Sequence, residues 1–157
     1  MPRTDVCPVT FEGSIEAAIQ MLDQIFIQYI DALYQVEGKQ EKSLLHSEGQ
    51  ATLKRKHLLE LALLEGRLGG QVAVKNIPTM NLDYALQQHS LTASSDARQV
   101  IAFAIHLEKL AEQYFRQMCS NCVSPQTEPL FNRLHQEQQQ RALTLEDLYE
   151  QHFLTEN

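Results

Sequence analysis

The chain has 157 residues, a size that fits one domain with a substantial buried core. Its composition, 43% hydrophobic and 21% charged, is that of a globular protein, and no apolar run is long enough to cross a membrane. The net charge of −7 is spread along the chain, which argues against nucleic acids and anionic membranes as partners.

The N-terminal residues and the cysteines both indicate a cytoplasmic protein. The first residues, Met1 to Val6, lack the apolar stretch of a signal peptide. Three cysteines, Cys7, Cys119 and Cys122, are too few for a disulfide scaffold, and their number is odd.

A first amphipathic helix is predicted over about 14–37. Ser14 is a suitable N-cap, and apolar residues then recur at steps of three and four residues. Asp23 lies inside this apolar row, between Ile19 and Phe26. The position of this acid on the apolar side of the helix calls for an explanation.

A second helix is predicted over about 42–67, ended by the glycines that begin at Gly66. Its apolar row is predicted to pass through Leu44, Ala51, Leu58, Leu61 and Leu68, and Lys54 and His57 precede Leu61 by seven and four residues. On that assumption Lys54 and His57 are polar residues at apolar positions.

The stretch 68–95 contains Gly-Gly, Pro78 and a polar run, and it is too long for a tight turn. It therefore predicts a long crossover between the second and third helices. Asp96 and Gln99 form a capping-box pattern at the start of a third helix over 96–121. Glu108 lies on the apolar row of that helix.

A fourth helix is predicted over 128–153, with Thr127 as its cap and Gln138 and Arg141 on its inner side. Almost no stretch has the alternation of a strand. The sequence therefore predicts a single all-α domain, 1–157, folded as a four-helix bundle.

The two predicted helix pairs resemble one unit used twice. Asp23 is matched by Glu108, since 108 − 23 = 85, and Lys54-x-x-His57 is matched by Gln138-x-x-Arg141, since 138 − 54 = 84. Leaving such residues unpaired in a core would be costly, so the centre of the bundle is predicted to hold a site. The polar residues concerned are Asp23, Lys54, His57, Glu108, Gln138 and Arg141.

The segment Ile105-His-Leu-Glu-Lys-Leu-Ala-Glu-Gln-Tyr-Phe115 resembles rubrerythrins, which belong to the ferritin-like superfamily. The resemblance covers most of 14–152 and implies a ferritin-like antiparallel bundle with the long crossover. It also implies two irons, held by a Glu on each of helices 1 and 3 and a Glu-x-x-His on each of helices 2 and 4. The activity implied is that of an oxidoreductase.

Carried over residue by residue, this resemblance gives only part of an iron site. Asp23 and Glu108 match the two lone carboxylates, and His57 matches the helix 2 histidine. The remaining ligand positions hold Lys54, Gln138 and Arg141, and two of these are cations, whereas iron prefers carboxylates and neutral imidazoles. The favoured interpretation is a lost di-iron site, with no metal there and a buried ion-pair network of Asp23, Glu108, Lys54 and Arg141 in its place.

Two other functions remain open. Asp23, His57 and Glu108 could bind one iron or another divalent metal and so support an oxidase or peroxidase. The bundle is expected to form a homodimer, because Ile25, Ile27 and Leu107 lie off the main apolar rows, and the chain could instead be a non-catalytic dimeric interaction module.

Two smaller features complete the predicted site. Cys119-x-x-Cys122 could be a redox dithiol or half of a zinc site, but two incidental cysteines are the favoured interpretation. Tyr29 and Tyr114 are predicted core residues within hydrogen-bonding reach of the central carboxylates.

Overall fold

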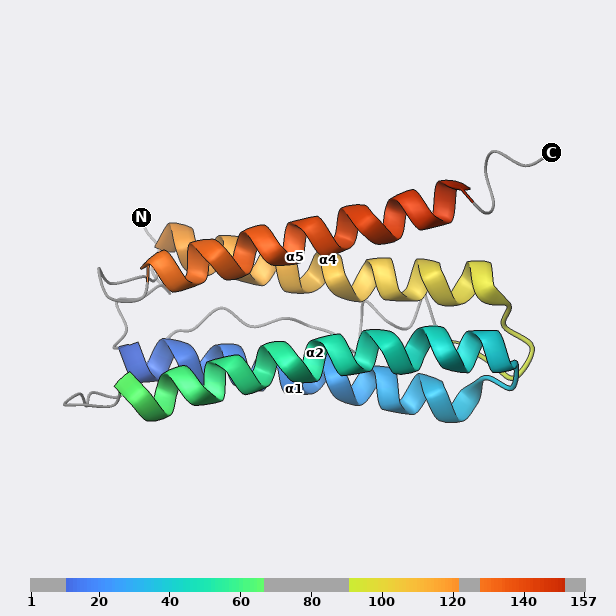
Figure 1. Cartoon of the computed structure of the whole chain (residues 1–157), viewed down its shortest axis with the longest axis horizontal. Coiled ribbons are helices and arrows are strands. Elements are labelled where there is room, and N and C mark those ends of the chain that lie inside the picture. The colour runs from blue at the N-terminus through green and yellow to red at the C-terminus, as the bar shows by residue number, and fades with distance from the viewer. Residues whose placement is uncertain (1–10, 67–90, 122–127, 152–157) are drawn as a thin grey trace, which may run out of the picture.

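Four helices make up almost all of the chain that the computed structural model describes, which comprises residues 11–66, 91–121 and 128–151 (Figure 1). The helices are α1 (Phe11–Gln35), α2 (Lys39–Gly66), α4 (Ala97–Asn121) and α5 (Glu128–Tyr149). Strands are absent from these described residues. The all-α prediction is thus confirmed, and the four helices fit a four-helix bundle. None of the described helices has the length and apolarity needed to span a membrane.

The predicted helix boundaries differ from the observed ones by a few residues. The start of α4 follows the predicted capping box: the Asp96 main-chain N–H donates to Gln99 Oε1 at 2.9 Å, and the Gln99 N–H donates to Asp96 Oδ1 at 3.0 Å. α1 begins at Phe11 rather than at Ser14. Most of the predicted crossover, 67–90, lies outside the described residues.

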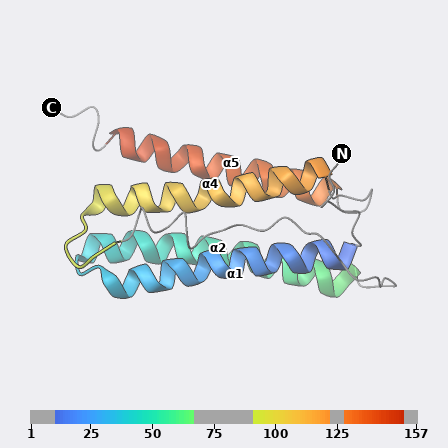
Figure 2. The ribbon, with the colours of Figure 1, turned by 180° about the vertical axis from the view of Figure 1, so that it is seen from behind.

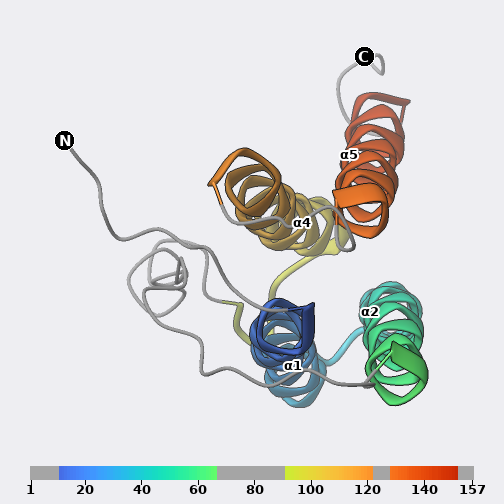
Figure 3. The same ribbon diagram turned by 90° about the vertical axis from the view of Figure 1, so that its left-hand side faces the viewer.

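The helices form two layers, α1 with α2 and α4 with α5. In Figure 1 the colours show α1 and α2 running in opposite directions, and likewise α4 and α5; Figure 2 shows the same layers from behind. The contacts agree, because Lys42 Nζ donates to the Leu33 carbonyl whereas Lys56, further along α2, reaches back to Asp23. Viewed end-on, the helices occupy four corners around a common centre (Figure 3).

The core is built from the apolar rows of all four helices. Tyr29 of α1 meets Phe103 of α4 edge-on, with ring centroids 6.2 Å apart. The predicted dimer surface of Ile25, Ile27 and Leu107 is wrong for two of its three residues, because Ile25 and Leu107 are both fully buried in this core. Ile27 alone of that predicted set is exposed, with 47% of its surface accessible.

Buried positions repeat between the two layers at a constant spacing. The matching pairs are Ile15 with Ile101 (101 − 15 = 86), Ala18 with Ala104, Leu22 with Glu108, Ala32 with Met118, Leu45 with Phe131, and Leu59 with Leu145 (145 − 59 = 86). The offsets of 85 and 84 predicted from the sequence are therefore one and two residues too short. Since successive helical residues are about 100° apart around the axis, this small error assigns the wrong face of a helix.

Candidate functional site

Glu108 is the centre of a buried polar cluster that all four helices form. Tyr29 Oη of α1 donates to Glu108 Oε2 at 2.6 Å, and Arg55 Nη2 of α2 donates to Oε1 at 3.0 Å. Gln138 Nε2 of α5 donates to the same Oε1 and, at 3.4 Å, to the Glu108 main-chain carbonyl. Glu108 and Gln138 are both completely buried. Both carboxylate oxygens of Glu108 are thus already engaged by protein donors.

A second ion pair lies beside the first and joins α2 to α5. Arg141 Nη2 donates to Glu48 Oε1 at 2.6 Å. Thr52 connects the two pairs, since its hydroxyl donates to the Glu48 carbonyl at 3.0 Å and accepts from Arg55 Nη2 at 3.5 Å. We call these residues the central cluster: Tyr29, Glu48, Thr52, Arg55, Glu108, Gln138 and Arg141.

The central cluster balances two carboxylates against two guanidinium groups. Burial raises the pKa of Glu48 above its ordinary value of 4.5, an effect that the adjacent Arg141 partly offsets. Burial, with the nearby charges of Glu108 and Glu48, also raises the pKa of the Tyr29 hydroxyl well above its ordinary value of 10.0. Tyr29 therefore keeps its proton and remains a hydrogen-bond donor to Glu108.

Some polar atoms of the cluster remain unpaired. Among the described residues, no hydrogen-bond partner reaches Arg55 Nε, Arg141 Nε or Gln138 Oε1. Tyr114 is also buried, which raises the pKa of its hydroxyl, and that hydroxyl has no hydrogen-bond partner within the described part of the chain. Tyr114 is thus a core residue as predicted but, unlike Tyr29, does not bind a central carboxylate.

The residues predicted to form the site divide into two groups. Glu108, Gln138 and Arg141 belong to the central cluster. Asp23 and His57 do not: the Asp23 side chain is 45% exposed and pairs with Lys56, while that of His57 is 77% exposed.

Lys54 is also exposed, so it cannot enter the predicted ion-pair network. Consequently, Asp23, His57 and Glu108 are not brought together. Within residues 11–66, 91–121 and 128–151, no group of three or more His, Cys, Asp or Glu side chains lies close enough to hold a metal ion. The Cys119-x-x-Cys122 prediction, like Cys7, falls outside the side chains that the structure describes.

Sequence reasoning missed three members of the cluster, Glu48, Thr52 and Arg55, because it chose the wrong face of α2. Leucines lie on every side of this helix, so the apolar pattern does not define one inner face. The correct signal was the internal repeat, since 138 − 52 = 86 and 141 − 55 = 86 match Thr52-x-x-Arg55 with Gln138-x-x-Arg141.

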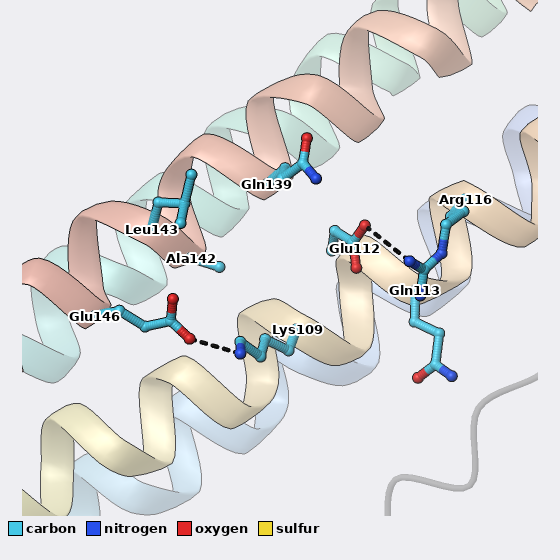
Figure 4. A pocket seen from close by; sticks show the side chains of 8 residues that line it. All are labelled: Lys109, Glu112, Gln113, Arg116, Gln139, Ala142, Leu143 and Glu146. Atoms are coloured by element: carbon cyan, nitrogen blue, oxygen red, sulfur yellow. Dashed lines mark ion pairs between the residues drawn. The ribbon is translucent and has the colours of Figure 1, made fainter.

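The outer surface between α4 and α5 carries a groove of about 460 Å³ (Figure 4). Its cations are paired with its acids: Lys109 lies 2.5 Å from Glu146, and Arg116 lies 3.8 Å from Glu112. His135 Nε2 also lies 2.6 Å from Glu112. The groove is a polar, charge-balanced surface, so the central cluster is the stronger candidate site.

Comparison with known proteins adds no assignment. No protein-family model, curated protein or solved structure matches this chain. The function therefore has to be inferred from the central cluster and from the surface of the bundle.

Proposed function

We propose that the chain is a ferritin-like antiparallel bundle of rubrerythrin type whose central cluster occupies the volume that holds two irons in that family. The arrangement of the helices supports this proposal. α2 ends and α4 begins at opposite ends of the bundle (Figure 1), as a long crossover between the second and third helices requires. The role proposed is that of a bundle protein without di-iron chemistry.

The observation that carries the proposal is the engagement of Glu108. Both of its oxygens already accept hydrogen bonds, Oε2 from Tyr29 and Oε1 from Arg55 and Gln138, so three of the roughly four acceptor positions of the carboxylate are occupied by protein donors. Arginine stays protonated at any physiological pH, so Arg55 and Arg141 would repel a divalent cation at this place. Carboxylates paired with guanidinium groups form a set of residues that does not suit iron.

A one-metal oxidoreductase that uses Asp23, His57 and Glu108 is the competing proposal. It is less well supported, because Asp23 and His57 are exposed whereas Glu108 is fully buried. α2 would have to rotate to bring His57 toward Glu108, and that rotation would remove Arg55 from its carboxylate.

Iron loading of the full chain tests these proposals. After anaerobic incubation with Fe(II), exposure to air and desalting, elemental analysis should find well below one iron per chain. Two irons per chain would refute the ion-pair proposal. One iron per chain that His57→Ala removes would favour the competing oxidoreductase.

The repeat offers a positive control for this measurement. The variant Leu22→Glu, Thr52→Glu, Arg55→His, Gln138→Glu, Arg141→His restores a Glu or a Glu-x-x-His on each helix at the observed register. We expect this variant to retain more iron than the wild type, with circular dichroism as the check that it remains helical.

A second candidate function is that of a homodimeric interaction module. The specific observation in its favour is a group of exposed apolar side chains on the α1–α2 layer, among them Tyr34, Leu61 and Leu64. This candidate is compatible with the first, because a bundle without metal chemistry acts through its surfaces.

A further inference from the structure

Exposed apolar side chains gather on one layer of the bundle. Among the described residues, the large apolar side chains with substantial exposure are Ile27 and Tyr34 of α1, Leu53, Leu58, Leu61 and Leu64 of α2, and Leu143 of α5. Thus α1 and α2 carry all of them but one. Leu64 is 71% exposed and Tyr34 is 82% exposed.

The internal repeat provides a control within the same chain. Positions 86 residues apart occupy equivalent places in the two layers, as 139 − 53 = 86 illustrates for Leu53 and Gln139. The counterparts of Ile27, Leu53, Leu58, Leu61 and Leu64 are Gln113, Gln139, Thr144, Asp147 and Glu150, all of which are polar. The exception is Leu143, whose counterpart is His57. The bundle therefore does not need apolar residues at these outer positions.

The polar counterparts behave as an ordinary surface. Gln113 and Gln139 line the groove between α4 and α5 (Figure 4), together with ion-paired side chains. The same place on the α1–α2 layer carries Ile27 and Leu53 instead. Single exposed leucines need no explanation, but a set concentrated on one of two equivalent layers points to a surface that another molecule covers.

Part of this set forms a straight row on α2. Leu53, His57, Glu60 and Leu64 are separated by four, three and four residues, which places them on one face of the helix. His57 Nδ1 lies 3.5 Å from Glu60 Oε1 in the middle of the row. We call these four residues the α2 row; it has a leucine at each end and a histidine–carboxylate pair at its centre.

We propose that a second copy of this chain covers the α2 row, with the two α2 helices packed in opposite directions about a two-fold axis. Leu53 and Leu64 are equally distant from the midpoint between Leu58 and Leu59, as are His57 and Glu60. A two-fold axis at that midpoint brings Leu53 against the partner's Leu64 and His57 against the partner's Glu60.

Charge complementarity favours a second copy in this orientation. With the two helices in opposite directions, the imidazole of His57 in each chain lies against the Glu60 carboxylate of the other chain, so the contact is made twice. With the helices parallel, Glu60 would meet the partner's Glu60, and like charges in contact are unfavourable. A closed two-fold pairing also uses the same patch on both chains, which is the commonest symmetry of soluble oligomers.

The exposed face of the α1–α2 layer is also large enough for a stable dimer interface. The 28 residues of α2 extend about 42 Å, and two adjacent helices are about 20 Å wide, so the α1–α2 face offers on the order of 800 Å². Stable interfaces bury about 800 Å² from each partner. This inference specifies the surface of the homodimer proposed above and rests on that proposal.

Sedimentation of the full-length chain is the first test. We expect a dimer for the wild type at about 10 μM, and a dissociation constant at least about 100-fold higher for Leu53→Ser combined with Leu64→Ser. Leu143→Ser, on the other layer, is the matched control and should remain as dimeric as the wild type. Circular dichroism checks that the variants stay folded.

Cross-linking tests the orientation independently of stability. In a chain with Cys7, Cys119 and Cys122 replaced by Ser, Leu53→Cys and Leu64→Cys are prepared as separate variants. We expect an interchain disulfide when the two variants are mixed and none when either is oxidised alone. The reason is that Leu53 would lie about 16 Å along the helix from the partner's Leu53, beyond the roughly 7 Å that a disulfide spans between Cα atoms.

The possible results separate the two proposals. A wild-type chain that stays monomeric at about 100 μM, far above the Kd of a stable dimer, refutes both the homodimer and this surface; residues 67–90 or an unrelated protein would then be the occupant to examine. A dimer that survives the double Leu→Ser substitution keeps the homodimer but refutes the α2 row. Self-cross-linking of either single variant refutes the opposite orientation of the helices.

Discussion

Glu108 connects all four helices through one side chain. It lies on α4 and receives hydrogen bonds from Tyr29 of α1, Arg55 of α2 and Gln138 of α5. An isolated buried carboxylate would be strongly disfavoured, but one that accepts several donors and faces a guanidinium group is stabilised. The effect of removing a donor therefore measures how much this residue depends on its partners.

Tyr29→Phe removes one donor and keeps the ring that packs against Phe103. We expect the free energy of unfolding to fall by about 1.5–3 kcal/mol, the usual contribution of a hydrogen bond to a charged group. Urea denaturation measures this loss. Tyr34→Phe is the control, because Tyr34 is exposed and its hydroxyl contributes less than about 0.5 kcal/mol. Equal effects of the two substitutions would contradict the assigned role of Tyr29.

Glu48 gives the protein a specific pH dependence. Because burial raises its pKa above the ordinary 4.5, the folded state binds its proton more readily than the unfolded state does. Its contribution to stability is therefore fully present below the unfolded pKa and is lost as the pH rises through the folded pKa.

Comparison with Glu48→Gln, which does not titrate at this position, isolates that contribution. The free energy of unfolding of the wild type, minus that of the variant, should decrease as the pH rises from about 4.5 and then become constant. Denaturation at several pH values provides the measurement. An increase over the same range would mean that the attraction of Arg141 outweighs the effect of burial.

Among the elements, α4 and α2 show why one helix can be predicted and another cannot. α4 has a single apolar row and a capping box at Asp96 and Gln99, so both its start and its inner face follow from the sequence. α2 has leucines on all sides, and its buried row includes Glu48 and Arg55. Because the buried row itself contains charged residues, apolar periodicity cannot identify it.

Substitutions on α2 can verify its observed register. Arg55→Ala leaves Glu108 buried without its cation, so we expect a loss of about 3–5 kcal/mol in the free energy of unfolding. Lys54→Ala, at the neighbouring exposed position, should change it by less than about 0.5 kcal/mol. Chemical denaturation of both variants is the measurement. A larger effect of Lys54→Ala would support the face that the sequence alone predicted.

In the whole molecule, the sequence predicts the four helices found in the described residues and the repeat between them, but only half of the site. Glu108, Gln138 and Arg141 were found because their helices have clear inner faces. Asp23, Lys54 and His57 were chosen because they lie on the apolar rows predicted from the sequence. The offsets of 85 and 84 that then matched them to the second pair of helices are one and two residues too short, which corresponds to a rotation of about 100° or more, and their side chains lie at the surface. The rubrerythrin resemblance stays a prediction.

The difference between Leu22 and Glu108, which occupy equivalent positions, makes the two halves of the chain unequal. If two α1–α2 halves assembled with each other, Arg55 would face a leucine and its charge would be buried without a carboxylate. Correct assembly of an α1–α2 half with an α4–α5 half avoids this penalty. The central cluster thus favours the pairing of an α1–α2 half with an α4–α5 half. It disfavours the pairing of two identical halves, an error to which chains with internal repeats are prone during folding.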